Sequence, residues 1–292
     1  MRSGLRLGLD LVKPRISLAA TASALAVFIL ATPGLGPRAM PLGLGVFLLA
    51  CGACGLNQYQ ERGADGLMRR TQGRPVPSGR LRPGAALLAA AALLAAGLPL
   101  IVEAAGPAGG LLAAAAVLWY NGVYTRLKRV TAFAVVPGAL VGAVPPALGW
   151  LAAGRPGRDP RLLALCFFFY FWQVPHFWLL VPGYGPDLER AGLPNLGRVL
   201  GPARLARLSA VWMSVAAASV LLLPVFGAVG PAAALVLLAA AGWLTWQAVR
   251  LLRQAGAGGS CRAAFARLNG FVIGVMALLA CEPFLAGLSR VP

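Results

Sequence analysis

The chain has 292 residues, of which 59% are hydrophobic and only 12% are charged. Soluble globular proteins are about 45–50% apolar and about 25% charged, so this composition excludes a soluble globular protein. The net charge of +18 would suit a nucleic-acid-binding protein, but the distribution of the basic residues along the chain argues against that class.

Long apolar segments rich in Ala and Leu follow one another along the chain, each close to the roughly 20 residues of a bilayer-spanning helix. Strands of a membrane barrel would instead alternate with period two. We therefore predict an all-α, polytopic integral membrane protein, with about nine transmembrane helices that enclose a cavity open to the cytoplasmic side. The predicted spans are about 16–35, 39–56, 84–103, 107–123, 132–153, 162–181, 208–228, 231–249 and 265–288.

Two glycine–proline pairs predict tight turns between spans. Gly106-Pro107 joins the third span to the fourth, and Gly230-Pro231 joins the seventh to the eighth. The first apolar segment follows Lys13-Pro14-Arg15 and is too long for the apolar region of a cleavable signal peptide. We expect residues 1–292 to form a single membrane domain with a short cytoplasmic arm over 1–15.

The basic residues are divided unequally between the two sides of the predicted membrane. Of the 26 Lys and Arg residues, 21 lie in segments on the side of the N-terminus. By the positive-inside rule, this bias predicts a cytoplasmic N-terminus, and we expect a multi-pass protein of the cell inner membrane. The same bias accounts for most of the basic residues, so we expect the lipid bilayer as a partner and expect no nucleic acid. The five on the opposite side are Arg38, Arg155, Arg158, Arg161 and Arg290.

The segment after the second predicted span carries three oxygen-bearing side chains spaced four residues apart, Asn57, Glu61 and Asp65. We expect this segment to continue as a helix. Four residues advance a helix by about 400°, so the three side chains form one stripe. Oxygen ligands of this kind suit Mg²⁺, which proteins hold through one or two carboxylates together with substrate phosphates. Arg70 and Arg74 follow, and guanidinium groups match the geometry of phosphate.

Taken alone, these acids also fit an exposed helix end with solvated charges. Pro75 and Pro77 then end the helical run in a rigid turn. The combination of an oxygen stripe, nearby arginines and a proline turn predicts a diphosphate site.

A second segment on the same side carries Tyr124, Lys128 and Arg129. The two cations either contact the same diphosphate or are ordinary determinants of membrane topology. Downstream, Pro137-Gly138, Gly142 and Pro145-Pro146 interrupt the fifth span, as is tolerated where helices pack or line a cavity.

A third segment contains Trp172, Gln173 and His176, which is the single histidine of the chain, and Asp187 lies beyond it. A lone histidine is often a hydrogen-bonded polar residue without further function. Because His176 lies in a predicted membrane helix, where polar side chains are costly, it is also a candidate iron ligand or acid–base group. Asp187 is a candidate second metal-binding carboxylate that faces the first stripe.

Three segments in this order resemble the protoheme IX farnesyltransferases (heme O synthases), a branch of the UbiA-type membrane prenyltransferase superfamily. The resemblance covers nearly the whole chain, including Lys13-Pro14-Arg15 at the start of the first span. After Asp187 the chain departs from the family, which usually has Asp-Tyr where Asp187-Leu188 stands. The segments are Asn57-x3-Glu61-x3-Asp65-x2-Met68-x-Arg70-Thr71-x2-Arg74-Pro75, Tyr124-Thr125-x-Leu127-Lys128-Arg129-x-Thr131 and the most discriminating one, Trp172-Gln173-x-Pro175-His176-Phe177.

The resemblance implies that Mg²⁺ on Asn57, Glu61 and Asp65, together with Asp187, binds farnesyl diphosphate. A vinyl group of heme B attacks the allylic cation and water adds, which gives heme O for terminal oxidase assembly. A downstream heme A synthase or terminal oxidase is a further implied partner. The residues that the resemblance assigns to the departing diphosphate are Arg70, Arg74, Lys128 and Arg129; those near the cation are Tyr124, Phe171 and Trp172; those that bind or orient heme B are His176, Trp172 and Gln173.

Two other functions fit parts of the sequence. A related prenyltransferase that acts on an aromatic acid or a quinone precursor keeps the metal chemistry and has no need of His176. A transporter or a heme-handling protein without catalysis also fits nine spans, although transporters place their polar site at the membrane midplane. Here the polar residues gather at one face.

Overall fold

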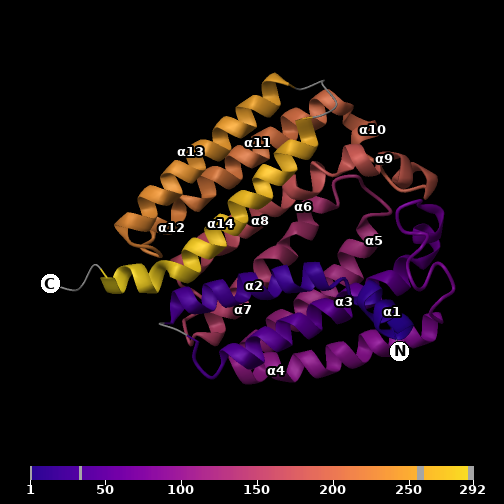
Figure 1. The fold of residues 1–292 in the computed structure, drawn as a ribbon, viewed down its shortest axis with the longest axis horizontal. Helices are drawn as coiled ribbons and strands as arrows, with labels where there is room; N and C mark the ends of the chain where they lie inside the picture. The colour runs from indigo at the N-terminus through magenta and orange to yellow at the C-terminus, as the bar shows by residue number, and fades with distance from the viewer. Residues whose placement is uncertain (1, 33–34, 255–259, 289–292) are drawn as a thin grey trace.

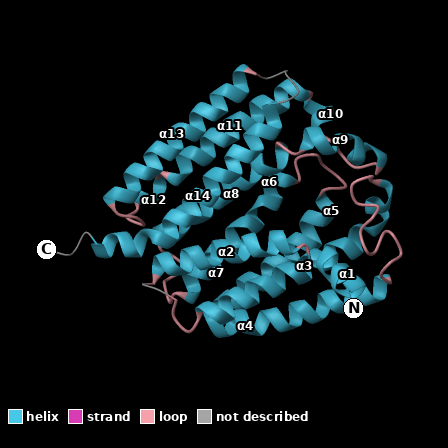
Figure 2. Ribbon diagram, viewed as in Figure 1, coloured by secondary structure: helices cyan, strands magenta, loops and turns pink. Residues whose placement is uncertain are grey.

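The computed structural model describes residues 2–32, 35–254 and 260–288. Within these ranges the chain forms helices and loops and has no strand, which confirms the predicted all-α class (Figure 2). Helices α1 to α4 are Arg2–Val12, Pro14–Ala31, Ala39–Leu67 and Pro83–Val117; then come the π-helix η1, Leu118–Tyr124, and α5 to α7 with the 3-10 helix η2, at Thr125–Leu127, Val135–Gly138, Ala139–Ala143 (η2) and Val144–Ala152. Helices α8 to α14 are Pro160–Trp178, Val181–Arg190, Leu196–Leu200, Pro202–Val220, Leu222–Val225, Pro231–Arg253 and Ser260–Leu288.

By length and composition, 7 helical segments of the described chain are able to cross a membrane, or 8 if α8 and α9 form one bent span. That count treats Pro83–Leu127 as one segment. Gly106 has φ 69° and ψ −176°, which are not helical. A Cβ atom on Gly110 would lie 2.6 Å from Val102 Cγ2. Eight residues of a continuous helix span about 12 Å, so the chain folds back at Gly106-Pro107, as predicted, and the number of crossings is close to nine.

Close contact between α3 and α4 depends on small residues. A Cβ atom on Gly97 would lie 3.0 Å from the carbonyl oxygen of Gly45, and one on Gly52 would lie 2.9 Å from that of Ala90. Membrane helices have no hydrophobic driving force between them, and they gain stability by packing at such short distances. The packing fixes the position of the last turns of α3, which carry the predicted oxygen stripe.

Two predicted spans are broken in the structure. The fifth, predicted as 132–153, consists of α6, η2 and α7 in succession, so its prolines and glycines interrupt the helix as expected. The sixth, predicted to reach residue 181, ends at Trp178, and α9 continues at an angle of 64° to α8. The break between α8 and α9 lies toward the end of the bundle where α1, α5 and α9 gather, at the right of Figure 1.

The long helices form two groups, which lie in the lower and upper parts of Figure 1. Helices α2, α3, α4 and α7 share one apolar core, and α8, α11, α13 and α14 form most of a second core. The groups meet where α14 packs against α2. We call the end of the bundle that carries α1, α5 and α9 the site end; the C-terminal part of α14 lies at the opposite end (Figure 1).

Candidate functional site

The predicted oxygen stripe lies on the last turns of α3, which remains helical to Leu67. Asn57 and Asp65 are buried, and the side chain of Glu61 is 14% exposed. The expected helical extension beyond the second apolar span is thus confirmed, and its three side chains lie at the site end of the bundle.

Each carboxylate of the stripe has a cation as its partner. Arg74 Nη1 lies 2.6 Å from Asp65 Oδ2, and Lys128 Nζ lies 2.6 Å from Glu61 Oε1. The hydroxyl of Thr71 donates to the backbone oxygen of Asp65 at 2.9 Å, which holds the turn that carries Arg74 against the end of α3. Segments that are well separated in sequence therefore bring two ion pairs side by side on α3.

The amide of Asn57 is oriented by η1 and the residue that follows it. In this π-helix, Tyr120 O accepts a hydrogen bond from Thr125 Oγ1 at 2.8 Å. The hydroxyl proton of Thr125 is thus committed, and its oxygen accepts from Asn57 Nδ2 at 3.2 Å. The amide nitrogen is occupied, so Asn57 Oδ1 is the atom left to bind a ligand. Single π-turns of this kind are frequent at functional sites.

Tyr124 is buried beneath the second ion pair. Lys128 Nζ lies 5.0 Å from the centre of its ring, and Tyr120 stacks on the same ring with centroids 5.7 Å apart. Gly138 is required here, because a Cβ atom at that position would collide with the Tyr124 ring. The predicted aromatic residue thus joins the stripe, with a π-face next to the charged groups.

Two of the cations predicted to bind the diphosphate, Arg70 and Arg129, make their contacts away from the stripe. The guanidinium of exposed Arg70 lies 4.4 Å from the ring centre of Tyr184 on α9. Arg129 Nη2 donates to the backbone oxygen of Gln60 at 3.0 Å. The structure therefore groups Arg74 and Lys128 with the stripe, whereas Arg70 and Arg129 hold neighbouring segments together.

Asp187 ties α9 to the loop that carries the arginines. Its carboxylate accepts from the backbone N–H groups of Arg69 and Arg70, each at 3.1 Å, and from Arg190 Nη1 at 2.9 Å. The hydrogen bond from the Arg70 N–H is the main reason that the pKa of this carboxyl lies below its ordinary value. In this arrangement Asp187 orders residues 68–74, and its role as a metal ligand stays a prediction.

The donor set suits a divalent cation, although no three His, Cys, Asp or Glu side chains gather as a metal-binding group in the described part of the chain. The stripe offers two carboxylates and the open amide oxygen Asn57 Oδ1, which are hard ligands of the kind that Mg²⁺ prefers. Both carboxylates face cations, so a metal ion would replace Arg74 and Lys128 there and leave them for an anion.

Lys13, to which we assigned no role from the sequence, also belongs to this site. It lies between α1 and α2 with φ 49°, a left-handed conformation that is uncommon for a residue other than glycine. Gln58 Nε2 holds the preceding turn by donating to Asp10 O at 2.7 Å and Leu11 O at 2.8 Å. Burial, and then the charge of nearby Arg74, lower the pKa of the Lys13 ammonium. In the sequence, the feature that could have indicated a role for Lys13 is its position directly before the first apolar span.

The predicted heme-binding residues form a separate cluster on α8. The His176 ring lies 5.0 Å from the Trp172 ring and 4.9 Å from the Phe265 ring of α14, measured between centroids. Gln173 packs against η2, because a Cβ atom on Gly142 would collide with its amide. Phe171 stacks near Trp212 of α11, with centroids 5.8 Å apart, and so faces a different side of α8 from His176.

Asn269 is a second residue of the candidate site that we did not predict from the sequence. Its Oδ1 lies 2.8 Å from His176 Nδ1, and its Nδ2 donates to Phe265 O at 2.7 Å. The available signal was an amide in the last apolar span, where polar side chains are costly.

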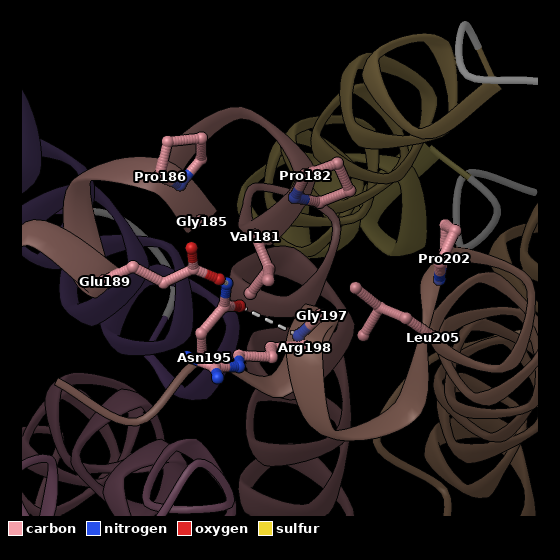
Figure 3. A pocket seen from close by; sticks show the side chains of 10 residues that line it. All are labelled: Val181, Pro182, Gly185, Pro186, Glu189, Asn195, Gly197, Arg198, Pro202 and Leu205. Atoms are coloured by element: carbon pink, nitrogen blue, oxygen red, sulfur yellow. Dashed lines mark hydrogen bonds between the residues drawn. The ribbon is translucent and has the colours of Figure 1, made fainter.

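One pocket at the site end, of about 360 Å³, lies between α9, α10 and α11 (Figure 3). Its lining includes Glu189, Asn195 and Arg198, and Asn195 Oδ1 accepts from the N–H of Gly197 at 2.9 Å. None of the residues that line this pocket belongs to the predicted stripe or to the His176 cluster.

Comparisons with known proteins agree on one family. A model described as the UbiA prenyltransferase family matches residues 19–271. A protoheme IX farnesyltransferase of Geobacter sulfurreducens is 44% identical over 231 residues, which cover 77% of this chain and 83% of that protein. Another, of Oleidesulfovibrio alaskensis, is 40% identical over 222 residues, which cover 76% of this chain and 78% of that protein.

Solved structures share the fold at low sequence identity. A digeranylgeranylglyceryl phosphate synthase has a TM-score of 0.78 at 13% identity, over 96% of this chain and 98% of that one. A UbiA homolog from Archaeoglobus fulgidus bound to GPP and Mg²⁺ has a TM-score of 0.64 at 16% identity, again over 96% and 98%. These likenesses confirm the predicted architecture of a helical membrane bundle.

Proposed function

Because this chain belongs to the UbiA prenyltransferase family, we propose that it transfers a farnesyl group from farnesyl diphosphate to a vinyl group of heme B, with addition of water, to give heme O. The relatives at 44% and 40% identity are protoheme IX farnesyltransferases, which supports heme B as the acceptor. Enzymatic prenyl transfer follows from the family and the fold.

Asn57, Glu61 and Asp65 would hold Mg²⁺, and Asp187 is the fourth candidate ligand. When bound, the metal supplies positive charge next to the leaving diphosphate. A homolog of the same fold was solved with GPP and Mg²⁺, which supports a divalent cation in this role. The ion pairs of Glu61 and Asp65 hold these carboxylates in place before substrate binds.

Arg74 and Lys128 bind the diphosphate directly in this proposal. Each is held at α3 by a carboxylate at 2.6 Å, so each needs only a small movement to reach an anion above the stripe. Charge-assisted hydrogen bonds from guanidinium and ammonium groups stabilise the departing diphosphate. Arg70 and Arg129 contribute less, because they contact Tyr184 and the backbone of Gln60.

The bond changes balance without an oxidant or a reductant. The bond between farnesyl C1 and oxygen breaks, and its electron pair leaves with the diphosphate. The π-electrons of the vinyl group form the new carbon–carbon bond, and water adds to the resulting cation and loses a proton. The buried ring of Tyr124 lies next to Lys128 and offers a π-face that stabilises positive charge near the reacting carbon.

The observation that carries this proposal is the pair of ion pairs on α3, Asp65 with Arg74 and Glu61 with Lys128, beside the open oxygen of Asn57. Carboxylates for a metal and cations for a diphosphate are present together, at one end of a membrane bundle. The acceptor rests on the relatives and on the cluster of His176, Trp172 and Gln173.

The test is a product analysis. Membranes that contain the protein are incubated with heme B, farnesyl diphosphate and Mg²⁺, and the extracted hemes are analysed by mass spectrometry. We expect a product heavier than heme B by a farnesyl group and a hydroxyl group, which is absent with EDTA or with Asp65→Asn. If a phenolic or naphthoic acceptor is prenylated and heme B is not, the enzyme belongs to another branch of the family.

The cellular setting is part of the proposal. The charge bias of the sequence supports a cell inner-membrane protein with a cytoplasmic N-terminus and a site that opens to the cytoplasm. The product would pass to a heme A synthase or a terminal oxidase. The single domain over 1–292 also stays a prediction.

A further inference from the structure

The single histidine of the chain has one hydrogen-bond partner in the described residues, and that partner comes from another helix. His176 Nδ1 on α8 and Asn269 Oδ1 on α14 are 2.8 Å apart, although the residues are 93 positions apart in sequence. The amide nitrogen of Asn269, Nδ2, donates to Phe265 O at 2.7 Å, one turn earlier on α14.

These two contacts fix the orientation of the amide and the tautomer of the imidazole. If the amide were reversed, two oxygen atoms would face each other at the Phe265 carbonyl, so the nitrogen must point there. The oxygen of Asn269 therefore faces the ring and is able only to accept. His176 Nδ1 must carry a proton, and in the neutral ring the lone pair is then on Nε2.

The surroundings of His176 point to a ligand with a large flat surface. Trp172 and Phe265 lie within 5.0 Å of the imidazole between centroids, and the Phe177 ring stands nearly perpendicular to it, at 87°. Trp172 Nε1 is buried without a hydrogen-bond partner in the described structure, and a buried donor of this kind is rare unless a ligand or water satisfies it.

We infer that Asn269 is a positioning residue that holds His176 with Nδ1 protonated and Nε2 open to bind the iron of the acceptor heme. This inference rests on the proposed function and adds a residue to it. Histidines that bind metals commonly donate their other ring N–H to an oxygen acceptor, which fixes the ring and makes it a stronger ligand. The Phe265 carbonyl fixes Asn269 in turn.

The test measures heme binding by the purified full-length protein in detergent. Ferric heme B is titrated and the Soret band is followed, and the KM of each substrate is determined. With Asn269→Leu we expect the Kd and the KM for heme B to rise by about 10-fold or more. The KM for farnesyl diphosphate should not change, because the stripe on α3 is intact.

Asn269→Asp distinguishes positioning from simple packing. An aspartate loses the hydrogen bond to Phe265 O, because its second oxygen faces that carbonyl, but it still accepts from Nδ1–H, so the Soret spectrum of histidine-bound heme should persist. A carboxylate that accepts from Nδ1–H makes the imidazole a stronger electron donor to the iron. The midpoint potential of the bound heme should therefore become more negative than in the wild type. Gln247→Leu on the adjacent helix α13 is the matched control, because it also removes a buried amide, and it should leave heme binding unchanged.

Wild-type heme affinity and spectrum in Asn269→Leu would overturn the inference. So would an Asn269→Asp protein with the wild-type midpoint potential, and this measurement decides the question if the leucine variant does not fold. The proposed function fails in a different way, namely if the wild-type protein makes no farnesylated heme. A wild-type enzyme that makes the product while Asn269→Leu behaves normally removes only the role of Asn269.

Discussion

The end of α3 and the facing sides of α8 and α14 hold their polar groups in opposite ways. On α3, Glu61 and Asp65 form ion pairs with Lys128 and Arg74, each at 2.6 Å. Between α8 and α14, a single imidazole is held by a neutral amide and surrounded by aromatic rings. Charges buried in a membrane protein are costly unless they are paired, whereas a neutral imidazole needs only one partner.

The difference fits the two ligands proposed for the regions. A diphosphate with its metal brings charges of both signs, and the ion pairs can exchange partners with them without leaving a charge unpaired. A heme brings a large apolar face and one iron atom, and a cluster of rings with one free nitrogen matches it. We therefore expect substitutions in the two regions to affect the two substrates separately.

The largest effect is expected at Asp65. Asp65→Asn removes a proposed metal ligand and leaves the Arg74 guanidinium without its partner, so kcat should fall by about 100-fold or more. Product formation from farnesyl diphosphate and heme B measures this, with heme affinity from the Soret titration as an internal control. A variant that keeps its rate would contradict the metal-binding role of the stripe.

His176→Ala should have the next largest effect and should affect the other substrate. Loss of the proposed iron ligand should raise the KM for heme B on the order of 10-fold to 100-fold, with no change in the KM for farnesyl diphosphate. The KM values of both substrates are measured on the same preparation. Equal changes in both would show that the two regions are not separable.

Lys13→Met tests whether the arm before α2 belongs to the diphosphate region. Burial, and then the charge of Arg74, lower the pKa of the Lys13 ammonium, so an anion at the site should stabilise its charged form and bind to it. We expect the KM for farnesyl diphosphate to rise by about 10-fold, or ~1.4 kcal/mol. Arg15→Met is the matched control, since Arg15 is exposed on the first turn of α2. An equal rise of this KM in both variants would show that Lys13 acts only as one of several surface charges.

The arginines of the first motif should differ from one another. Arg74→Ala should lower kcat by about 10-fold, as expected for loss of a charge-assisted hydrogen bond to the leaving group. Arg70→Ala should lower it less than about 3-fold, because that guanidinium contacts Tyr184. Steady-state rates at saturating substrate give both values. A reversed order would mean that Arg70 turns toward the site when substrate binds.

The smallest effect on chemistry is expected at Asp187, together with a clear effect on the loop. Asp187→Ala removes the acceptor of the Arg69 and Arg70 N–H groups, so trypsin should cleave after these exposed residues faster than in the wild type. Glu189→Ala on the same helix is the control, because Glu189 contacts Asn195 and not the loop. Unchanged cleavage accompanied by lost Mg²⁺ dependence would instead support Asp187 as a metal ligand.

The sequence predicted most of the α3 region because its residues are local. Asn57, Glu61 and Asp65 share one helix, and their spacing alone places them on one face. The turn at Gly106 was also predictable, since glycine followed by proline at the middle of a long apolar stretch seldom continues a helix. The fifth span was expected to be interrupted, and its three short helices confirm this.

Contacts between distant segments were not predictable from the same patterns. Nothing in the local sequence indicates that Arg70 contacts Tyr184, that Thr125 orients Asn57, or that Asn269 meets His176. Each depends on how helices pack against one another. The spacing of the motif did not distinguish the role of Arg70 from that of Arg74, and only the packing of the loop against α9 separates the two.

The hydrogen bonds between Asp187 and the N–H groups of Arg69 and Arg70 form late during synthesis of the protein. The loop after α3 is synthesised long before α9, because Asp187 lies 118 positions beyond Arg69. A nascent chain that has inserted α3 and α4 thus carries the carboxylates but lacks the contact that orders the loop. The loop is ordered only after translation has passed α9, so trypsin should cleave it faster in truncated chains that remain in the membrane than in the full-length protein.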